Sequence, residues 1–199
     1  MTNKFTEKKE LKRQLIINNA RLVFSEKGYT AVTMKDIIEK SNISRGGIYL
    51  YFSSVEEVFL AVLNDRSNSR FKFIYELIEK DESFNVIIHK YMEEHKERLL
   101  NEIDTSLLRA TYEYYFFNNL KKGTSSVQTK QLKNIKKILL SIFDVGINKK
   151  EILPSNIDAI VNQFALVIEG LSILALTHSI DEQLIDKQFS LLLSLVYYT

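Results

Sequence analysis

Residues 33–52 constrain the fold more than any other stretch, because two short helical patterns meet there across a tight turn. The first pattern carries Met34 and Ile37 on one side, and the second carries Ile48 and Phe52. Two helices joined by a turn of a few residues form a helix-turn-helix. The stretch therefore predicts this motif, and the rest of the chain has to be interpreted around it.

The residues that flank these two patterns fit the ends of helices. Thr33 and Asp36 have the spacing of a capping box, with Asp in place of the usual Glu. Asn42 lies in the turn, where its tolerance of the left-handed backbone conformation is useful. Ser44 precedes the second helix and is a suitable N-cap.

Gly46 and Gly47 conflict locally with the second helix, since each costs a helix interior up to about 1 kcal/mol relative to Ala. One interpretation is that the helix backbone approaches a DNA strand closely at this point. The other is that the helix begins only after Gly47. We favour the first, because Arg45, Tyr49 and Tyr51 surround the pair.

The side chains around the glycines have the chemistry of DNA recognition. Arg45 at the start of a recognition helix can bind guanine O6 and N7 with two hydrogen bonds, which discriminates between bases by about 1–3 kcal/mol. Tyr49 and Tyr51 offer hydroxyl groups to phosphate. The alternative is that a tyrosine fills the core, but the two flank Leu50 on different helix sides, so at least one should be exposed.

Basic residues are concentrated at the start of the chain. Residues 1–52 carry ten Lys or Arg against five Asp or Glu, although the whole chain has a net charge of only +2. A basic head on a mildly acidic body is expected if only the head meets phosphate. A solvated charged surface is the alternative. Lys8, Lys12 and Arg13 lie near the start of the first predicted helix, in position to reach backbone phosphates.

Helical patterns continue through the remaining chain, which has one Pro and six Gly among 199 residues. Residues 6–27 predict a first helix that Gly28 ends, and residues 54–79 predict one long helix without a flexible linker. We therefore expect an all-α protein of about nine helices. Residues 1–53 would form a three-helix DNA-binding domain, and residues 54–199 a helical effector-binding and dimerisation domain.

The last two predicted helices, residues 157–178 and 179–198, are apolar nearly all round in parts. The pattern places caps at Ser155 and Ser179. A helix without a polar side is buried on all sides. Packing against the same pair from a second copy would achieve this, so we expect a two-fold homodimer through a four-helix bundle. A core within one subunit is the alternative.

Other functional classes find little support. Cys is absent, and no metalloprotease, P-loop, nucleophile-elbow or dinucleotide motif occurs. His89 and His95 lie six residues apart, which does not suit ligands on one helix side. We expect no enzyme activity, no cofactor and no metal. The longest uncharged runs, 170–180 and 188–199, are shorter than the roughly 18 residues of a membrane span, so a cytoplasmic protein is expected.

The helix-turn-helix region resembles a known family. The residues that carry the likeness are Phe24-Ser25-Glu26-Lys27-Gly28-Tyr29, Thr33, Asp36-Ile37 and Ile43-Ser44-Arg45-Gly46-Gly47-Ile48-Tyr49-Leu50-Tyr51-Phe52. With this spacing, residues 10–63 are similar to the TetR family of bacterial transcriptional repressors. The remaining chain resembles the family only in being helical and of suitable length.

The resemblance implies a dimer whose third helices enter successive major grooves of a palindromic operator. It places phosphate contacts at Thr33, Tyr49 and Tyr51, and groove-facing positions at Ser44, Arg45 and Gly47. Val55 departs from the family pattern, since a phosphate-binding Lys is common there. The expected DNA-binding residues are Thr33, Lys35, Ser44, Arg45, Gly46, Gly47, Tyr49 and Tyr51.

An aromatic concentration in the second part of the chain predicts a pocket for a small lipophilic or aromatic effector, an expectation that leans on the resemblance. The expected lining residues are Phe84, Met92, His95, Tyr112, Tyr115, Phe116, Asn119, Phe164 and Glu169. Binding would shift the fourth helix and release the operator. The alternative is a ligand-independent DNA-binding protein that uses its body only for dimerisation.

Overall fold

The computed structural model describes residues 2–103, 105–119, 126–153 and 155–197. These residues form ten helices and no strand, which confirms the all-α prediction. Contacts divide the chain into two compact units. Unit 1 comprises Met1–Ser69 and Asp104–Lys122, and unit 2 comprises Arg70–Ile103 and Gly123–Thr199.

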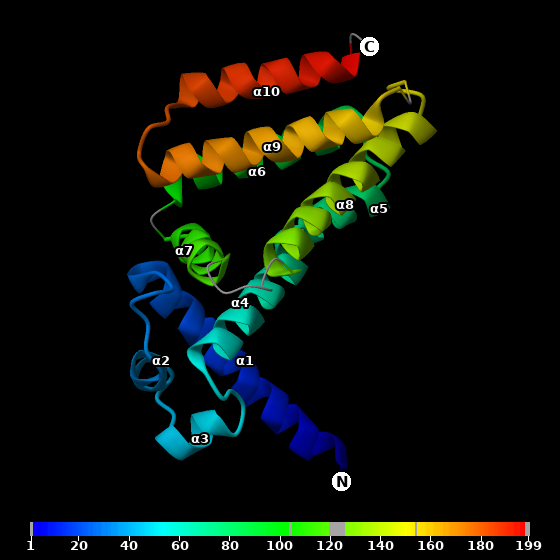
Figure 1. Ribbon diagram of the computed structural model, residues 1–199. Helices are drawn as coiled ribbons and strands as arrows, with labels where there is room; N and C mark the ends of the chain where they lie inside the picture. The colour runs from blue at the N-terminus through cyan, green and yellow to red at the C-terminus, as the bar shows by residue number, and fades with distance from the viewer. Residues whose placement is uncertain (1, 104, 120–125, 154, 198–199) are drawn as a thin grey trace. The chain divides into compact units, whose positions relative to one another are not determined.

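Unit 1 is built on α1, the longest helix of the described chain (Figure 1). Its helices are α1 (Thr2–Lys27), α2 (Met34–Ser41), α3 (Arg45–Tyr49), α4 (Val55–Arg70) and α7 (Leu108–Asn119). The core gathers apolar side chains from the successive helices: Ile16, Ala20, Phe24, Ile37, Ile48, Phe52, Phe59 and Val62 are all buried. Both α2 and α7 pack against α1.

The predicted helix ends around the turn are confirmed. Thr33 Oγ1 accepts a hydrogen bond from the backbone N–H of Asp36, and the Asp36 carboxylate accepts one from the backbone N–H of Thr33, which completes a capping box. Asn42 adopts the left-handed conformation with φ 51°. Ser44 Oγ accepts from the backbone N–H of Gly47 at 3.1 Å and so caps α3.

Helix α7 is bonded to the connection between α1 and α2. The Glu113 carboxylate accepts hydrogen bonds from the backbone N–H and the hydroxyl of Thr30, at 3.0 and 3.1 Å, and an ion pair with Arg109 holds it in place. The ring of Tyr29 packs edge-on against Tyr114, with centroids 4.9 Å apart. Packing therefore groups α7 with the helix-turn-helix. The predicted division of the chain after residue 53 concerns function and stays a prediction.

Unit 2 contains α5 (Lys72–Glu79), α6 (Phe84–Asn101), α8 (Ser126–Asn148), α9 (Ile157–Leu176) and α10 (Glu182–Tyr197). Helix α9 packs against α6, α8 and α10. Phe143 lies at the centre, with its ring centroid 5.4 Å from that of Phe84 and 5.8 Å from that of Phe164. Outside this core, Lys96 pairs with Glu182 and Asp186 and ties α6 to α10.

Three predicted helix features are wrong. The single helix expected over residues 54–79 is two helices, and Phe71 between them has φ −108° and ψ 12°, outside the helical range. The Ser67-Asn68-Ser69 run just before it has low helix propensity. At α9 the N-cap is Asn156 in the left-handed conformation, instead of Ser155. At α10 the cap is Asp181, whose carboxylate accepts from the backbone N–H of Leu184, instead of Ser179.

Replacing Gly28 by Ala should destabilise unit 1. Gly28 has φ +79°, and a Cβ there would lie 2.5 Å from both carboxylate oxygens of Glu113. The left-handed conformation alone costs a non-Gly residue about 1–2 kcal/mol, so urea unfolding should show at least that loss. As a control, Gly170→Ala in α9 meets no atom within 4 Å and should be neutral or stabilising. Equal effects of the two substitutions would contradict the conformational argument.

Candidate nucleic-acid interface

Helix α3 is held by its inner side and presents its outer side to solvent. Ile48 is fully buried and Phe52, just after the helix, is 2% exposed. Arg45 and Gly46 are exposed, and Tyr49 is 46% exposed. Tyr51 is half-buried. Arg45, Gly46 and Tyr49 are thus exposed to solvent, in agreement with the expectation that at least one tyrosine lies outside the core.

The two glycines of α3 have different reasons to be glycine. The helix spans Arg45–Tyr49 and includes both, so the alternative start after Gly47 is wrong. A Cβ at Gly47 would lie 2.9 Å from Ile43 Cγ2 and 3.0 Å from Ser44 Oγ, so packing within the chain requires a small residue there. A Cβ at Gly46 would meet nothing within 4 Å. No contact in the described chain therefore accounts for a glycine at position 46.

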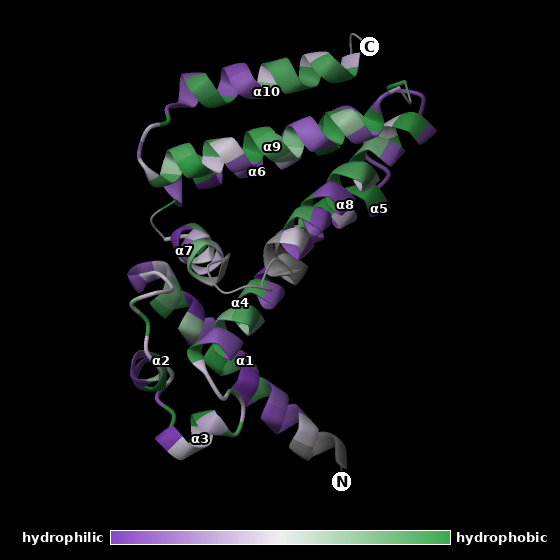
Figure 2. Ribbon diagram, in the orientation of Figure 1, coloured by the Kyte–Doolittle hydropathy of each residue, from purple (hydrophilic) through white to green (hydrophobic). Residues whose placement is uncertain are grey.

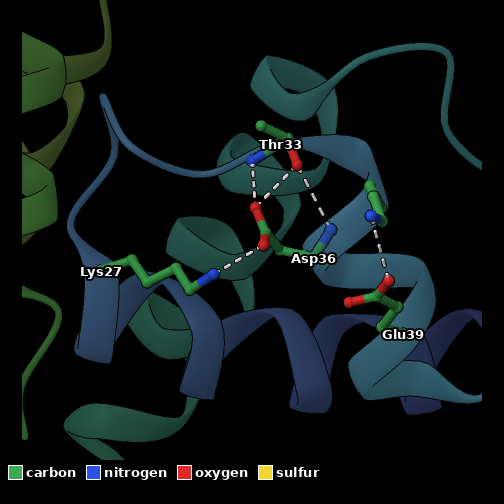
Figure 3. A network of polar contacts seen from close by, with 5 residues as sticks. Lys27, Thr33, Asp36 and Glu39 are labelled. Carbon is green, nitrogen blue, oxygen red and sulfur yellow. Dashed lines mark hydrogen bonds and ion pairs between the residues drawn. The ribbon is translucent and has the colours of Figure 1, made fainter.

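The start of α2 carries a polar network, drawn in Figure 3. One carboxylate oxygen of Asp36 accepts from Lys27 Nζ at 2.6 Å, and the other accepts from the backbone N–H and the hydroxyl of Thr33. These bonds hold the pKa of Asp36 well below its ordinary value, with the Lys27 bond the largest cause. Lys35 is exposed and pairs with Glu39 at 3.7 Å. The network fixes Thr33 and leaves Lys35 at the surface.

Arg13 makes a contact with Phe52 that the sequence did not predict. Its guanidinium lies 5.4 Å from the ring centroid of Phe52, a cation–π contact that joins α1 to the segment after α3. The start of α4 is also fixed locally: the Glu57 carboxylate accepts from the backbone N–H and hydroxyl of Ser53, which lowers the pKa of Glu57. The segment that follows α3 is therefore held both by α1 and by the first turn of α4.

The predicted effector-binding residues are distributed over both units. Unit 2 holds the side chains of Phe84, Met92, His95 and Phe164, all buried, and Glu169, which is half-buried. Helix α7 of unit 1 holds Tyr112 and Tyr115, which are half-buried, and Phe116, which is 69% exposed. The side chain of Asn119 lies outside the described residues. A single pocket formed by this set stays a prediction.

His95 has a neighbour that the predicted set lacks. An Arg98 terminal nitrogen lies 3.0 Å from His95 Nδ1, and both side chains are buried in unit 2. Because guanidinium groups only donate, Nδ1 accepts, and the His95 proton is on Nε2. A groove of about 470 Å³ runs between α9 and α10, and its lining includes Gln163, Leu191 and Leu195. Among the described residues, no group of three His, Asp or Glu side chains could hold a metal ion.

Comparison with family models covers both parts of the chain. Residues 16–62 match the N-terminal model of the bacterial regulatory proteins of the tetR family, and residues 87–186 match the tetracyclin repressor-like C-terminal domain. The chain belongs to the TetR family. Its members are DNA-binding transcriptional regulators and not enzymes, which agrees with the predicted class.

Two relatives illustrate how far the sequence likeness within the TetR family extends. The uncharacterised regulator YfiR of Bacillus subtilis is 37% identical over 115 residues, which cover 57% of this chain and 55% of YfiR. IcaR of Staphylococcus epidermidis, the negative transcriptional regulator of the biofilm operon icaADBC, is 31% identical over 71 residues, which cover 36% of this chain and 37% of IcaR. The chain thus spans about half the length of YfiR and less of IcaR.

Solved structures share the TetR fold over nearly the whole chain. Reduced NemR of E. coli superposes with a TM-score of 0.77 at 14% identity, covering 93% of this chain and 97% of NemR. The TetR-family regulator CifR, a cysteine mutant solved with 26 bp of double-stranded operator DNA, gives a TM-score of 0.65 at 15% identity, covering 90% and 92%. At these identities the likeness concerns the fold alone.

Asp36→Asn should lower the stability of unit 1 and should make that stability less dependent on pH. Because folding lowers the pKa of Asp36, its charge stabilises the folded state above the unfolded-state pKa of about 4, and this contribution is lost as the pH falls below that value. We expect a loss of about 1–2 kcal/mol in urea unfolding at neutral pH, shrinking towards about pH 2. The control Asp144→Asn, at an exposed position on α8, should change the stability little. A stability loss in Asp36→Asn that does not vary with pH would contradict the role of the Asp36 charge in its hydrogen-bond network.

Proposed function

We propose that this TetR-family protein is a cytoplasmic, sequence-specific repressor that binds a palindromic DNA operator as a homodimer and is released by a small lipophilic or aromatic effector. The observation that carries the DNA part is α3, whose outer side exposes Arg45, Gly46 and Tyr49 while its inner side is buried. The operator complex of CifR and the name of IcaR as a negative regulator support the same assignment.

The proposal assigns different roles to five residues of the interface. Arg45 reads guanine in the major groove, where a guanidinium can donate two hydrogen bonds to O6 and N7. Gly46 lets the helix backbone approach the DNA, because no side chain stands between them. Tyr49, Tyr51 and Lys35 contact phosphates and fix the register without reading sequence.

Apolar side chains on α9 and α10 support dimerisation of unit 2. Leu166 and Ile173 on α9 are 66% and 48% exposed, and Leu191 on α10 is 58% exposed. Figure 2 shows how strongly apolar residues dominate α9. This helix is also long and apolar enough to pass for a membrane span by length and composition alone, with 44% of the tested window buried. A second copy packed on α9 and α10 would cover the exposed part.

The effector part of the proposal is supported by the position of α7. Tyr112 and Tyr115, both expected to contact the effector, lie on the helix that also carries Glu113. Since Glu113 is bonded to Thr30, a ligand that displaces α7 would pull on the connection between α1 and α2. The needed difference in affinity between the two states is about 1–3 kcal/mol. In a ligand-independent repressor, the hydrogen bonds of Glu113 to Thr30 would serve stability alone.

DNA binding can be tested with a pair of variants in α3. Arg45→Ala should weaken binding to DNA from upstream of the protein's own gene by about 1–3 kcal/mol and reduce its preference over unrelated DNA. Gly46→Ala should keep or raise thermal stability, since the Cβ enters open space, yet weaken DNA binding. Fluorescence anisotropy and thermal unfolding measure the two effects. Unchanged DNA binding in both variants would contradict the interface.

Dimerisation can be tested by placing charge on the apolar surface. Leu166→Glu combined with Leu191→Glu should convert a species of twice 23.2 kDa into one of 23.2 kDa in sedimentation, because two buried carboxylates oppose association. The control Val86→Glu, at a 45% exposed position on α6, should leave the dimer intact. A wild-type monomer at micromolar concentration would refute the dimer.

A further inference from the structure

The N-terminal half of α1 extends beyond what the core of unit 1 requires. The family match begins at residue 16, and Ile16 is also the first buried residue among the described side chains of the helix. Helix α1 nevertheless begins at Thr2, and every described side chain from residue 6 to residue 12 is exposed. At 1.5 Å per residue, the segment from Thr2 to Arg13 projects by about 16 Å. Burial within the chain does not explain it.

The projecting segment is basic. Residues 2–13 contain Lys4, Lys8, Lys9, Lys12 and Arg13 against two acids, Glu7 and Glu10, and the first turn contains no acid. This is the reverse of the usual preference, because the positive end of a helix dipole favours negative side chains. Among the described side chains, the ion pair of this segment is Arg13 with Glu10, at 3.7 Å and exposed. Exposed pairs of this kind contribute little, so the positive charge stands largely uncompensated.

The basic segment lies beside the recognition helix. Arg13 stacks on Phe52, three residues after the end of α3, and thereby fixes this turn of α1 next to the interface. Lys9 lies one turn before Arg13, and Lys8 lies one turn before Lys12, so the four bases form two adjacent rows along the helix. Figure 1 shows the N-terminal end of α1 and helix α3 at the same end of unit 1.

We propose that the N-terminal turns of α1 form a second DNA contact, in which Lys8, Lys9 and Lys12 bind phosphates that flank the half-site read by α3. The inference rests on the proposed DNA-binding function and adds a surface that lies before the family match. Duplex DNA carries one negative charge per about 1.7 Å, so a projection of about 16 Å passes several phosphates. Contacts of this kind add affinity and position the protein, without reading sequence.

A charge-neutralising variant tests the proposal. Lys8→Gln, Lys9→Gln and Lys12→Gln together keep helix propensity and solubility while removing three charges. Each lost phosphate contact reduces the slope of log affinity against log salt by about 0.9, so the triple variant should lose about 2–3 units of slope per subunit. The matched control removes three charges from α8 of unit 2, by Gln substitution of Lys133, Lys136 and Lys137, and should retain the wild-type slope.

A DNA-length series locates the contact. The upstream site is first mapped by hydroxyl-radical footprinting, and fragments are then trimmed from outside the two half-sites. Wild type and the α8 control should lose affinity as the flanks shorten, and the α1 triple variant should not. A triple variant that matches wild type in both salt slope and flank dependence overturns the proposal. Arg45→Ala separates the α1 contact from the proposed function: a variant that loses sequence preference but keeps its dependence on the flanks supports both. If the wild-type protein does not bind the DNA at all, the proposed function itself is refuted.

Discussion

The burial of Ile48 and Phe52 is the constraint on which the interface depends. A helix of five residues is not stable alone in water, so α3 persists only because its inner side is packed into the core of unit 1. Ser44 fixes its start by accepting a hydrogen bond from the backbone N–H of Gly47, and Asn42 ends α2 just before it, where its own backbone N–H bonds to the last carbonyls of that helix. With the inner side held, Arg45 and Tyr49 can face solvent at a defined angle. Glycine at position 46 lowers the stability of the helix, and the packing of the surrounding core offsets this loss.

Features encoded by neighbouring residues could be predicted from the sequence. The capping box at Thr33 and Asp36, the left-handed Asn42 and the Ser44 cap all depend on spacings of a few residues. The bond between Glu113 and Thr30 joins positions 83 residues apart, and nothing local to either indicates it. The predicted caps of α9 and α10 were wrong because several residues near each helix start could precede it. Asp181 caps α10 with its carboxylate, whereas Asn156 precedes α9 in the left-handed conformation and makes no side-chain capping bond.

The position of α7 shows why domain boundaries read from sequence and from packing differ. The C-terminal family match spans residues 87–186 and so includes α7, yet α7 packs with the helix-turn-helix. Its contacts include aromatic packing, as between Tyr29 and Tyr114, and hydrogen bonds, which join Glu113 to Thr30 and the Tyr114 hydroxyl to Glu56. Aromatic packing tolerates small shifts, whereas hydrogen bonds near 3 Å do not. The hydrogen bonds of α7 are therefore better candidates than its aromatic contacts for transmitting a small displacement.

Helix α9 raises the question of why a DNA-binding protein contains a segment with the composition of a membrane span. Its most apolar window of 18 residues has a mean hydropathy of 1.9, but the helix also contains Asp158 and Glu169, which are costly within a bilayer. One side of α9 already packs against α6, α8 and α10, and such contacts suit a bundle. The other side exposes Leu166 and Ile173. One subunit alone buries only part of the surface of α9. A second copy packed on the other side would account both for the apolar composition of the helix and for its exposed leucine and isoleucine.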